Sequence, residues 1–132
     1  MNNDLCPCGS SRLYLDCCGI FIEKGAAPAS AEKLMRSRYV AYVKRKGNYV
    51  LDTWHRSTRP TQISLEDDAR WLGLKIKAVS KGQLGDSEGT VEFVARYKIA
   101  GRGFRLHEVS RFVFENERWF YTEALDTLSS KL

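Results

Sequence analysis

The spacing of apolar residues changes near the middle of the chain. Between residues 30 and 54 they recur at steps of three and four, whereas beyond residue 73 they tend to alternate with polar residues. The first spacing is typical of helices with one buried face, and the second of strands with one buried face. The pattern therefore predicts helices followed by a sheet, which is an α+β arrangement.

The first predicted helix begins after Ser30, a favourable N-cap, and has Glu32 in its first turn. It ends in a basic triplet, residues 44–46, directly before Gly47. Cations at a helix C-terminus interact favourably with the helix dipole, so the triplet indicates a solvated helix end rather than a binding patch. The apolar positions of this helix are Leu34, Met35, Tyr39, Tyr42 and Val43.

Two further helices are expected before the sheet begins. Asn48 is a suitable N-cap for one that runs through Trp54, and Ser64 for another that runs to about Leu72. Acidic residues follow Ser64 at positions 66–68, where the positive end of a helix dipole favours them. The main domain is therefore expected to contain three helices.

Four strand-like segments follow, and the connections between them read "KGQLGDSEG", "AGRG" and "ENE". The prediction is a curved, mostly antiparallel sheet wrapped over the three helices. Its strands are Leu74–Val79, Val91–Ile99, Phe104–Phe114 and Arg118–Ala124.

Alternation within the strands indicates which side chains face the interior. Along Phe104–Phe114 it places Glu108 among aromatic residues on the inner face, while His107 points outward. A buried carboxylate must be paired or neutralised. We therefore expect Glu108 within hydrogen-bond or ion-pair reach of a cationic side chain, with these candidates: Arg36, Arg38 and His55.

These residues define a candidate interior pocket, which comprises Arg36, Arg38, Tyr39, Trp54, His55 and Glu108. As structure, Glu108 forms a buried ion pair that fixes the helices on the sheet, and the segment "TWHRSTRP" is a turn locked by side-chain hydrogen bonds. As chemistry, Glu108 or His55 is a general base in a partly apolar pocket. No paired acid–base spacing favours the second interpretation, so no catalytic residue is assigned.

Composition and charge narrow the range of functions. The 132 residues, 43% of them hydrophobic, are enough for one real core, and no run approaches the roughly 18 apolar residues that span a bilayer. The formal charge is +5, and residues 30–60 hold eight basic residues against two acidic ones. This modest excess is only weak support for nucleic-acid binding by bulk charge. Sequence-specific readout of nucleic acid is not expected, and no phosphate-binding glycine loop is present.

The four cysteines carry the clearest chemical signal. They occur within "CPCGSSRLYLDCCG", residues 6–19, as a C-x-C pair followed by a C-C pair. The N-terminus resembles no signal peptide, so a reducing cytoplasm is expected, and a bridge within either pair would fit disulfide geometry poorly. Zn²⁺ ligation by four thiolates is favoured, while crossed disulfides and an iron–sulfur cluster remain as alternatives.

A tetrahedral site of this kind is closed, because four thiolates leave no position for water. One structural Zn²⁺, held by Cys6, Cys8, Cys17 and Cys18, is therefore expected to supply most of the folding free energy of a small knuckle. Within it, Ser10 is expected to cap a helical turn from Ser11 to Asp16. The predicted organisation is a knuckle over residues 1–22, a linker over 23–29 and the main domain over 30–132.

Two family resemblances support this division. The cysteine spacing with "CPCGS" and Tyr14 resembles the SEC-C zinc motif found at the C-terminus of the SecA translocase motor. The segments "LMRSRYVAYV" and "TWHRSTRP" resemble the YchJ-like family, in which a SEC-C motif precedes a nuclear transport factor 2-like domain. The resemblance implies a cone-shaped, cystatin-like fold for the main domain, and an interior that is either filled or open.

The knuckle departs from the SEC-C pattern in its charge. SEC-C motifs usually carry lysines around the tyrosine, on a surface associated in SecA with a chaperone and acidic lipids, whereas residues 1–20 here have one basic and two acidic residues. Leu13 and Leu15 instead suggest packing on the chain's own larger domain. The favoured function is a cytoplasmic zinc-binding accessory protein that recognises a protein or ribonucleoprotein partner. The alternative is an enzyme or carrier with a small-molecule ligand in the cone.

Overall fold

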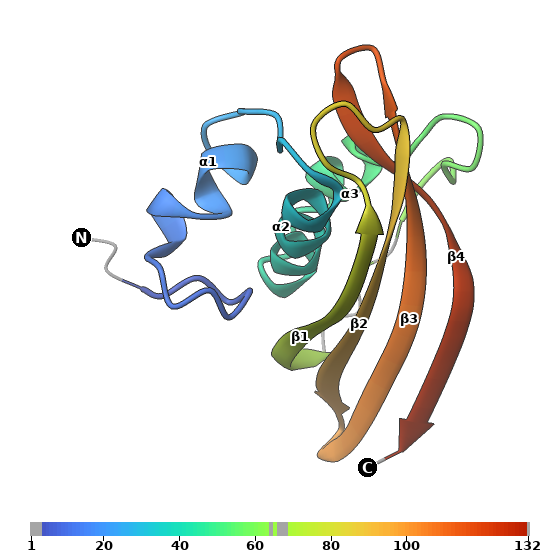
Figure 1. Ribbon diagram of the computed structural model, residues 1–132. Coiled ribbons are helices and arrows are strands. Elements are labelled where there is room, and N and C mark those ends of the chain that lie inside the picture. Colours follow the sequence, from blue (N-terminus) through green and yellow to red (C-terminus); the bar gives the residue numbers. More distant parts are fainter. Residues whose placement is uncertain (1–3, 64, 66–68, 132) are drawn as a thin grey trace.

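The computed structural model describes residues 4–63, 65 and 69–131, and it has helices on one face of a curved sheet (Figure 1). The helical elements are a 3₁₀ turn, η1 (Tyr14–Asp16), and three α-helices: α1 (Gly19–Ile22), α2 (Ala31–Val43) and α3 (Gly47–Asp52). The strands are β1 (Arg70–Lys81), β2 (Glu88–Ile99), β3 (Arg102–Glu115) and β4 (Arg118–Lys131). The expected α+β architecture is confirmed.

Helix α2 begins where the sequence predicts. The Ser30 hydroxyl accepts a hydrogen bond from the Lys33 backbone N–H at 3.2 Å, which is the geometry of an N-cap. Helix α3 begins earlier than expected, with Lys46 rather than Asn48 at the N-cap position, and it ends at Asp52 rather than Trp54.

The third helix predicted for the main domain is wrong at its C-terminal end. Residues 70–72 belong to β1, and most of the rest of that segment lies outside the described residues. Trp71 explains the difference, because its ring contacts Tyr39 at 5.8 Å and Tyr97 at 5.0 Å between centroids. Burial of this side chain between α2 and β2 outweighs the local helical signal.

The sheet is an antiparallel meander in the order β1-β2-β3-β4. Each strand is longer than predicted, and β4 continues to Lys131 rather than ending at Ala124. β-Bulges interrupt β1 between Trp71 and Gly73, and again between Ile76 and Ala78. Bulges bend and twist a strand, which fits the curvature of the sheet around α2 (Figure 1).

The core lies between α2 and the concave face of the sheet. Leu34, Val40, Val91 and Phe112 are fully buried there. Three of the four cysteines, together with Tyr14, belong to the same continuous cluster of buried side chains. The N-terminal segment therefore packs on the main domain and extends its core.

Candidate metal centre and interior cavity

Short-range hydrogen bonds fold the N-terminal segment into a knuckle. The Cys6 backbone N–H donates to the Arg12 carbonyl at 2.7 Å, and Leu5 and Leu13 form an antiparallel bridge. Gly9 turns the chain with a φ of +86°, a conformation that favours glycine. The helical turn expected from Ser11 is shorter than predicted, because Ser11 has a positive φ and η1 starts only at Tyr14.

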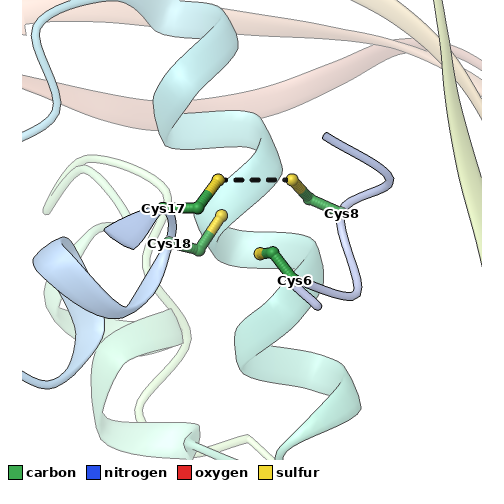
Figure 2. Close-up of side chains that lie close together, drawn as sticks. All are labelled: Cys6, Cys8, Cys17 and Cys18. Atoms are coloured by element: carbon green, nitrogen blue, oxygen red, sulfur yellow. Dashed lines mark hydrogen bonds between the residues drawn. The ribbon is translucent and has the colours of Figure 1, made fainter. Parts of the chain in front are cut away.

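The four cysteine sulfur atoms converge, as Figure 2 shows, and all lie within 4.8 Å of one another. Cys6 and Cys8 come from the first turn, while Cys17 and Cys18 lie at the junction of η1 and α1. The Cys8 and Cys17 sulfurs are 3.8 Å apart, and all four residues are free thiols. This arrangement is compatible with metal binding.

The electrostatics of the cluster favour a cation at its centre. Hydrogen bonds with Cys6 and Cys8, followed by burial, raise the pKa of the Cys18 thiol. Hydrogen bonds with Cys18 and Cys6 lower the pKa of Cys8. Four thiolates this close would repel one another, and a bound cation removes that repulsion. Four sulfur donors suit soft metals such as zinc rather than magnesium or calcium.

Side chains outside the cysteine set hold the cluster against α2. Arg36 donates from Nη1 to the Cys8 carbonyl at 3.0 Å, and the same nitrogen lies 3.7 Å from the Cys8 sulfur. Ser10 Oγ lies 3.2 Å from the Cys17 sulfur. Arg36 was predicted to line the interior pocket, but the structure places it at the knuckle.

Tyr14 makes a second attachment between the knuckle and the main domain. Its hydroxyl donates to Glu23 at 2.8 Å, and Lys44 lies 4.2 Å above its ring. Gly19 has no room for a side chain, since a Cβ there would lie 2.7 Å from the Tyr14 carbonyl oxygen. The motif tyrosine is therefore a packing residue, and a lysine of the basic triplet stacks on it.

The two leucines expected to face the main domain behave differently. Leu15 packs against the core cluster, whereas Leu13 is exposed. Sequence reasoning missed the contributions of Glu23 and Lys44 to this contact. From the sequence alone, a basic triplet at a helix C-terminus is expected to face solvent. Only the tertiary fold, in which the knuckle packs on α2, brings Tyr14 next to Lys44.

A cavity of about 260 Å³ lies between α2 and the concave face of the sheet. Arg38, Tyr39, Trp54 and Glu108 line it, so the structure brings together four of the six predicted pocket residues. The other lining residues are Met35, Tyr42, Trp71, Phe93, Ala95, Leu106 and Tyr121. A neighbouring cavity of about 250 Å³ shares Tyr42, Trp71 and Leu106 with it.

Glu108 faces this cavity, as strand alternation predicts, but its expected partner is wrong. Its carboxylate accepts hydrogen bonds from Ser110 Oγ at 2.5 Å and from Thr127 Oγ1 at 3.4 Å. Among the described residues it forms no ion pair, and Arg36, Arg38 and His55 all bond elsewhere. The hydroxyls come from β3 itself and from β4, because a carboxylate on a strand reaches its sheet neighbours before it reaches a helix across a cavity.

Arg38 is a buried cation, and no carboxylate of the described residues forms an ion pair with its guanidinium. Nη1 donates to the Val50 carbonyl and to Thr53 Oγ1, both at 2.7 Å. Its Cζ also lies 4.5 Å from the Tyr121 ring centroid and 5.2 Å from that of Trp54. Burial lowers the pKa of Arg38 and raises that of Tyr121 to about 12. The guanidinium thus holds α2 to α3 and forms part of the cavity wall.

His55 does not line the cavity. Its Nε2 lies 2.9 Å from Glu115 Oε2, and its Nδ1 lies 2.7 Å from Ser57 Oγ. Arg56 donates to the other Glu115 oxygen at 2.6 Å, and these two partners lower the pKa of the Glu115 carboxyl. This is the arrangement expected of a turn locked by side-chain hydrogen bonds.

Two family models match the chain. One is described as YchJ, middle NTF2-like domain, and matches residues 30–124, while the SEC-C motif matches residues 3–20. A UPF0225 protein from Chromobacterium violaceum is 48% identical over 124 residues, which cover 91% of each chain. A UPF0225 protein from Bordetella pertussis is 50% identical over 125 residues, covering 89% of this chain and 90% of its own.

Solved structures with the same fold carry the same motif. The solution structure of a SEC-C motif containing protein from Rhodopseudomonas palustris matches with a TM-score of 0.79 and 34% identity, covering 94% of this chain and 97% of that one. The crystal structure of a SEC-C motif containing protein from Psychrobacter arcticus matches with a TM-score of 0.76 and 25% identity, covering 98% and 86%. Within the described residues of this chain, no helix is long and apolar enough to cross a membrane.

Proposed function

Because the chain belongs to the YchJ (UPF0225) family, we propose that it is a zinc-stabilised protein whose cone cavity binds a small organic molecule. The observation that carries the proposal is the open, aromatic-lined cavity that reaches Glu108. An open cavity is the feature that distinguishes a ligand-binding cone from one whose interior is a filled core. The proposed organisation remains a knuckle over residues 1–22, a linker over 23–29 and a binding domain over 30–132.

The metal has a structural part in this proposal. Cys6, Cys8, Cys17 and Cys18 would hold one Zn²⁺, with Arg36 and Ser10 fixing the outer hydrogen bonds of the site. Four sulfur ligands complete a tetrahedron, so the ion would hold the knuckle together and leave no position for a reacting water. Cysteines that bind a metal must stay reduced rather than form disulfides. The cytoplasm keeps thiols reduced, which supports a cytoplasmic location.

The cavity combines largely apolar walls with two charged groups, Arg38 and Glu108, as small-molecule sites commonly do. Its volume of about 260 Å³ suits a compact, partly aromatic ligand. Each Glu108 oxygen accepts one hydrogen bond from the protein and has a further lone pair, so the carboxylate can accept a hydrogen bond from an N–H or O–H group of the ligand. Aromatic side chains such as Trp54 and Trp71 provide stacking surfaces.

A screen of small aromatic compounds by amide NMR shifts tests this proposal. Bound compounds should shift the signals of Leu106 and Glu108, and Ala95→Leu should abolish the shifts by filling the cavity. Ala78→Leu, the same substitution at an exposed position of β1, should leave them unchanged. Hits that map elsewhere, or that survive Ala95→Leu, would contradict the proposal.

Partner recognition, the function favoured by the sequence, remains the second candidate. It is supported by a groove of about 410 Å³ between the knuckle and α2, which includes Arg12, Lys33 and Arg36 but also Asp16 and Glu32. Because the groove has charged side chains of both signs, it provides less selectivity for a binding partner than the cone cavity provides for a ligand. If this groove holds a protein or ribonucleoprotein partner, Arg12→Glu with Lys33→Glu should release the partner and leave small-molecule binding unchanged.

A further inference from the structure

The outer face of the sheet points away from α2 (Figure 1), and the strand register places five cations at one end of it. Strand register places Arg70 opposite Lys98 and Arg96 opposite Arg105, and Lys75 lies on the same face opposite Val94. Inner positions alternate with these, as the packing of Trp71 against Tyr97 shows. These five cations, Arg70, Lys75, Arg96, Lys98 and Arg105, are called the basic end.

The other end of the same face balances its charges locally. His107 Nε2 lies 2.6 Å from Glu92, and Arg111 lies 4.0 Å from Glu88 and 3.9 Å from Glu123. No cation of the basic end has a carboxylate within 4.0 Å in the part of the chain that the structure describes. All five are exposed except Arg105, which is half-buried.

This arrangement works against the stability of the sheet. Like charges directly opposite each other on neighbouring strands are destabilising, and the register has two such pairs, Arg96 with Arg105 and Arg70 with Lys98. The main core lies on the concave face, so these charged groups are outside it. A repulsive cluster on an uncovered face is stabilised when an anionic surface lies against it.

We propose that the basic end is a docking surface for an anionic lipid membrane. The cations cover three neighbouring strands in three successive rows, a two-dimensional patch that matches a layer of headgroups. Two exposed leucines flank them: Leu72, 50% exposed in the β1 bulge, and Leu128, 61% exposed and opposite His107. Apolar side chains beside cations suit the interfacial layer of a bilayer.

Nucleic acid fits this surface less well. The five cations have no aromatic, asparagine or glutamine side chain among them or at the positions paired with them in the register. Asparagine and glutamine read adenine edges and aromatic side chains stack on bases, so the patch lacks these groups and has only its cations for base contacts. A bare phosphate backbone would use the cations but would leave Leu72 and Leu128 without a role. The observations therefore favour headgroups.

The expected association is reversible and sensitive to salt. A basic patch is one membrane signal, and stable anchoring takes two. Exposed charges are screened within about 10 Å at moderate ionic strength, so added salt should release the protein. The partner requires only a negative headgroup, because the patch presents point charges rather than a shaped pocket.

Co-sedimentation with vesicles tests the proposal on the full-length, metal-loaded chain. It should bind vesicles of equimolar phosphatidylglycerol and phosphatidylcholine at low salt, and fail to bind phosphatidylcholine alone. Arg96→Gln combined with Arg105→Gln should lower the partition coefficient about 30-fold, on the basis of about 1 kcal/mol for each cation. The urea midpoint of this variant should not fall, because a like-charge pair is removed.

Arg111→Gln is the matched control, since it removes one cation from the balanced end of the same face. It should change vesicle binding by less than about twofold. Absence of binding to the anionic vesicles would overturn the proposal, as would equal losses in the control and the double variant. Tighter binding to duplex DNA than to the vesicles, with the same response to the substitutions, would reassign the surface to phosphate backbones.

Discussion

The knuckle and the cone domain are neighbours in one protein but are stabilised by different means. In residues 4–18 the buried side chains are three cysteines and Tyr14, so the knuckle has almost no apolar interior apart from its thiols. In the main domain, which is called the cone from here on, buried aliphatic and aromatic residues such as Leu34, Val40 and Phe112 form the interior. This interior needs no metal ligand to hold it together. In the proposed function, the knuckle would close around a metal ion, whereas the main domain excludes water from its core.

The difference shows how a small unit can be stable beside a larger one. A knuckle of this size cannot bury enough apolar surface to fold alone, and the proposed metal ion would supply what is missing. Arg36 and Tyr14 then join it to α2, so the cone contributes orientation as well as burial. Loss of the metal should therefore unfold the knuckle alone, and loss of buried apolar area should destabilise the cone alone.

The largest difference in effect between the knuckle and the cone is expected from Cys8→Ser. Loss of one thiolate should reduce zinc from about one ion per chain to a small fraction of that, because a three-sulfur site holds zinc much more weakly. Elemental analysis measures the metal, and amide exchange measures the structure of residues 4–24. Exchange in β2 and β3 should be unchanged, and a general loss of protection would show that the two parts are not separable.

Phe112→Ala should have the opposite effect, because it should destabilise the cone and leave the knuckle intact. Phe112 is fully buried in the cone, so its truncation should destabilise that domain by about 3–5 kcal/mol in urea unfolding followed by circular dichroism. Zinc content under native conditions should remain at the wild-type level. Loss of the ion together with the cone's stability would contradict the comparison.

A smaller effect, on zinc affinity, is expected from a substitution at the contact between the knuckle and α2. Arg36→Ala removes the hydrogen bond to the Cys8 carbonyl and should weaken zinc affinity about 10- to 100-fold, as measured by competition with a chelator. Glu32→Ala is the matched control, because Glu32 pairs with Arg36 at 2.9 Å and bonds none of the cysteines. Equal losses in both variants would mean that the Glu32–Arg36 pair, rather than the bond to Cys8, sets the affinity.

The smallest expected effect is a pH dependence confined to the cone. His55 and Arg56 lower the pKa of Glu115 in the folded state, below the ordinary value of 4.5. The folded state therefore binds the proton less tightly than the unfolded state, so the stabilisation is complete well above pH 4.5 and is lost as the pH falls through the depressed pKa. The difference in urea midpoint between wild type and Glu115→Gln should shrink in that acidic range. A constant difference down to the lowest pH would contradict this.

Local patterns predicted the features that local physics determines. The Ser30 cap, the strands and the cysteine spacing depend on residues within a few positions of one another, and the structure agrees with the sequence there. Features that depend on distant residues were not predictable. Trp71 lies in a strand because α2 and β2 enclose it, and Glu108 bonds Thr127, nineteen positions away. Arg36 likewise bonds Cys8, which is twenty-eight positions away.

The knuckle precedes α2 and the sheet in the chain, and this order has a consequence for biosynthesis. Its internal backbone hydrogen bonds join residues 4–26, so the four thiols can converge as soon as that segment leaves the ribosome. The hundred or so residues of the linker and the main domain take roughly 5–20 s to synthesise at ordinary translation rates. During that interval the cysteines are exposed, with neither Arg36 nor Lys44 yet in place beside them. Early capture of the metal would protect the nascent chain from oxidation and leave a finished surface for α2 to fold against.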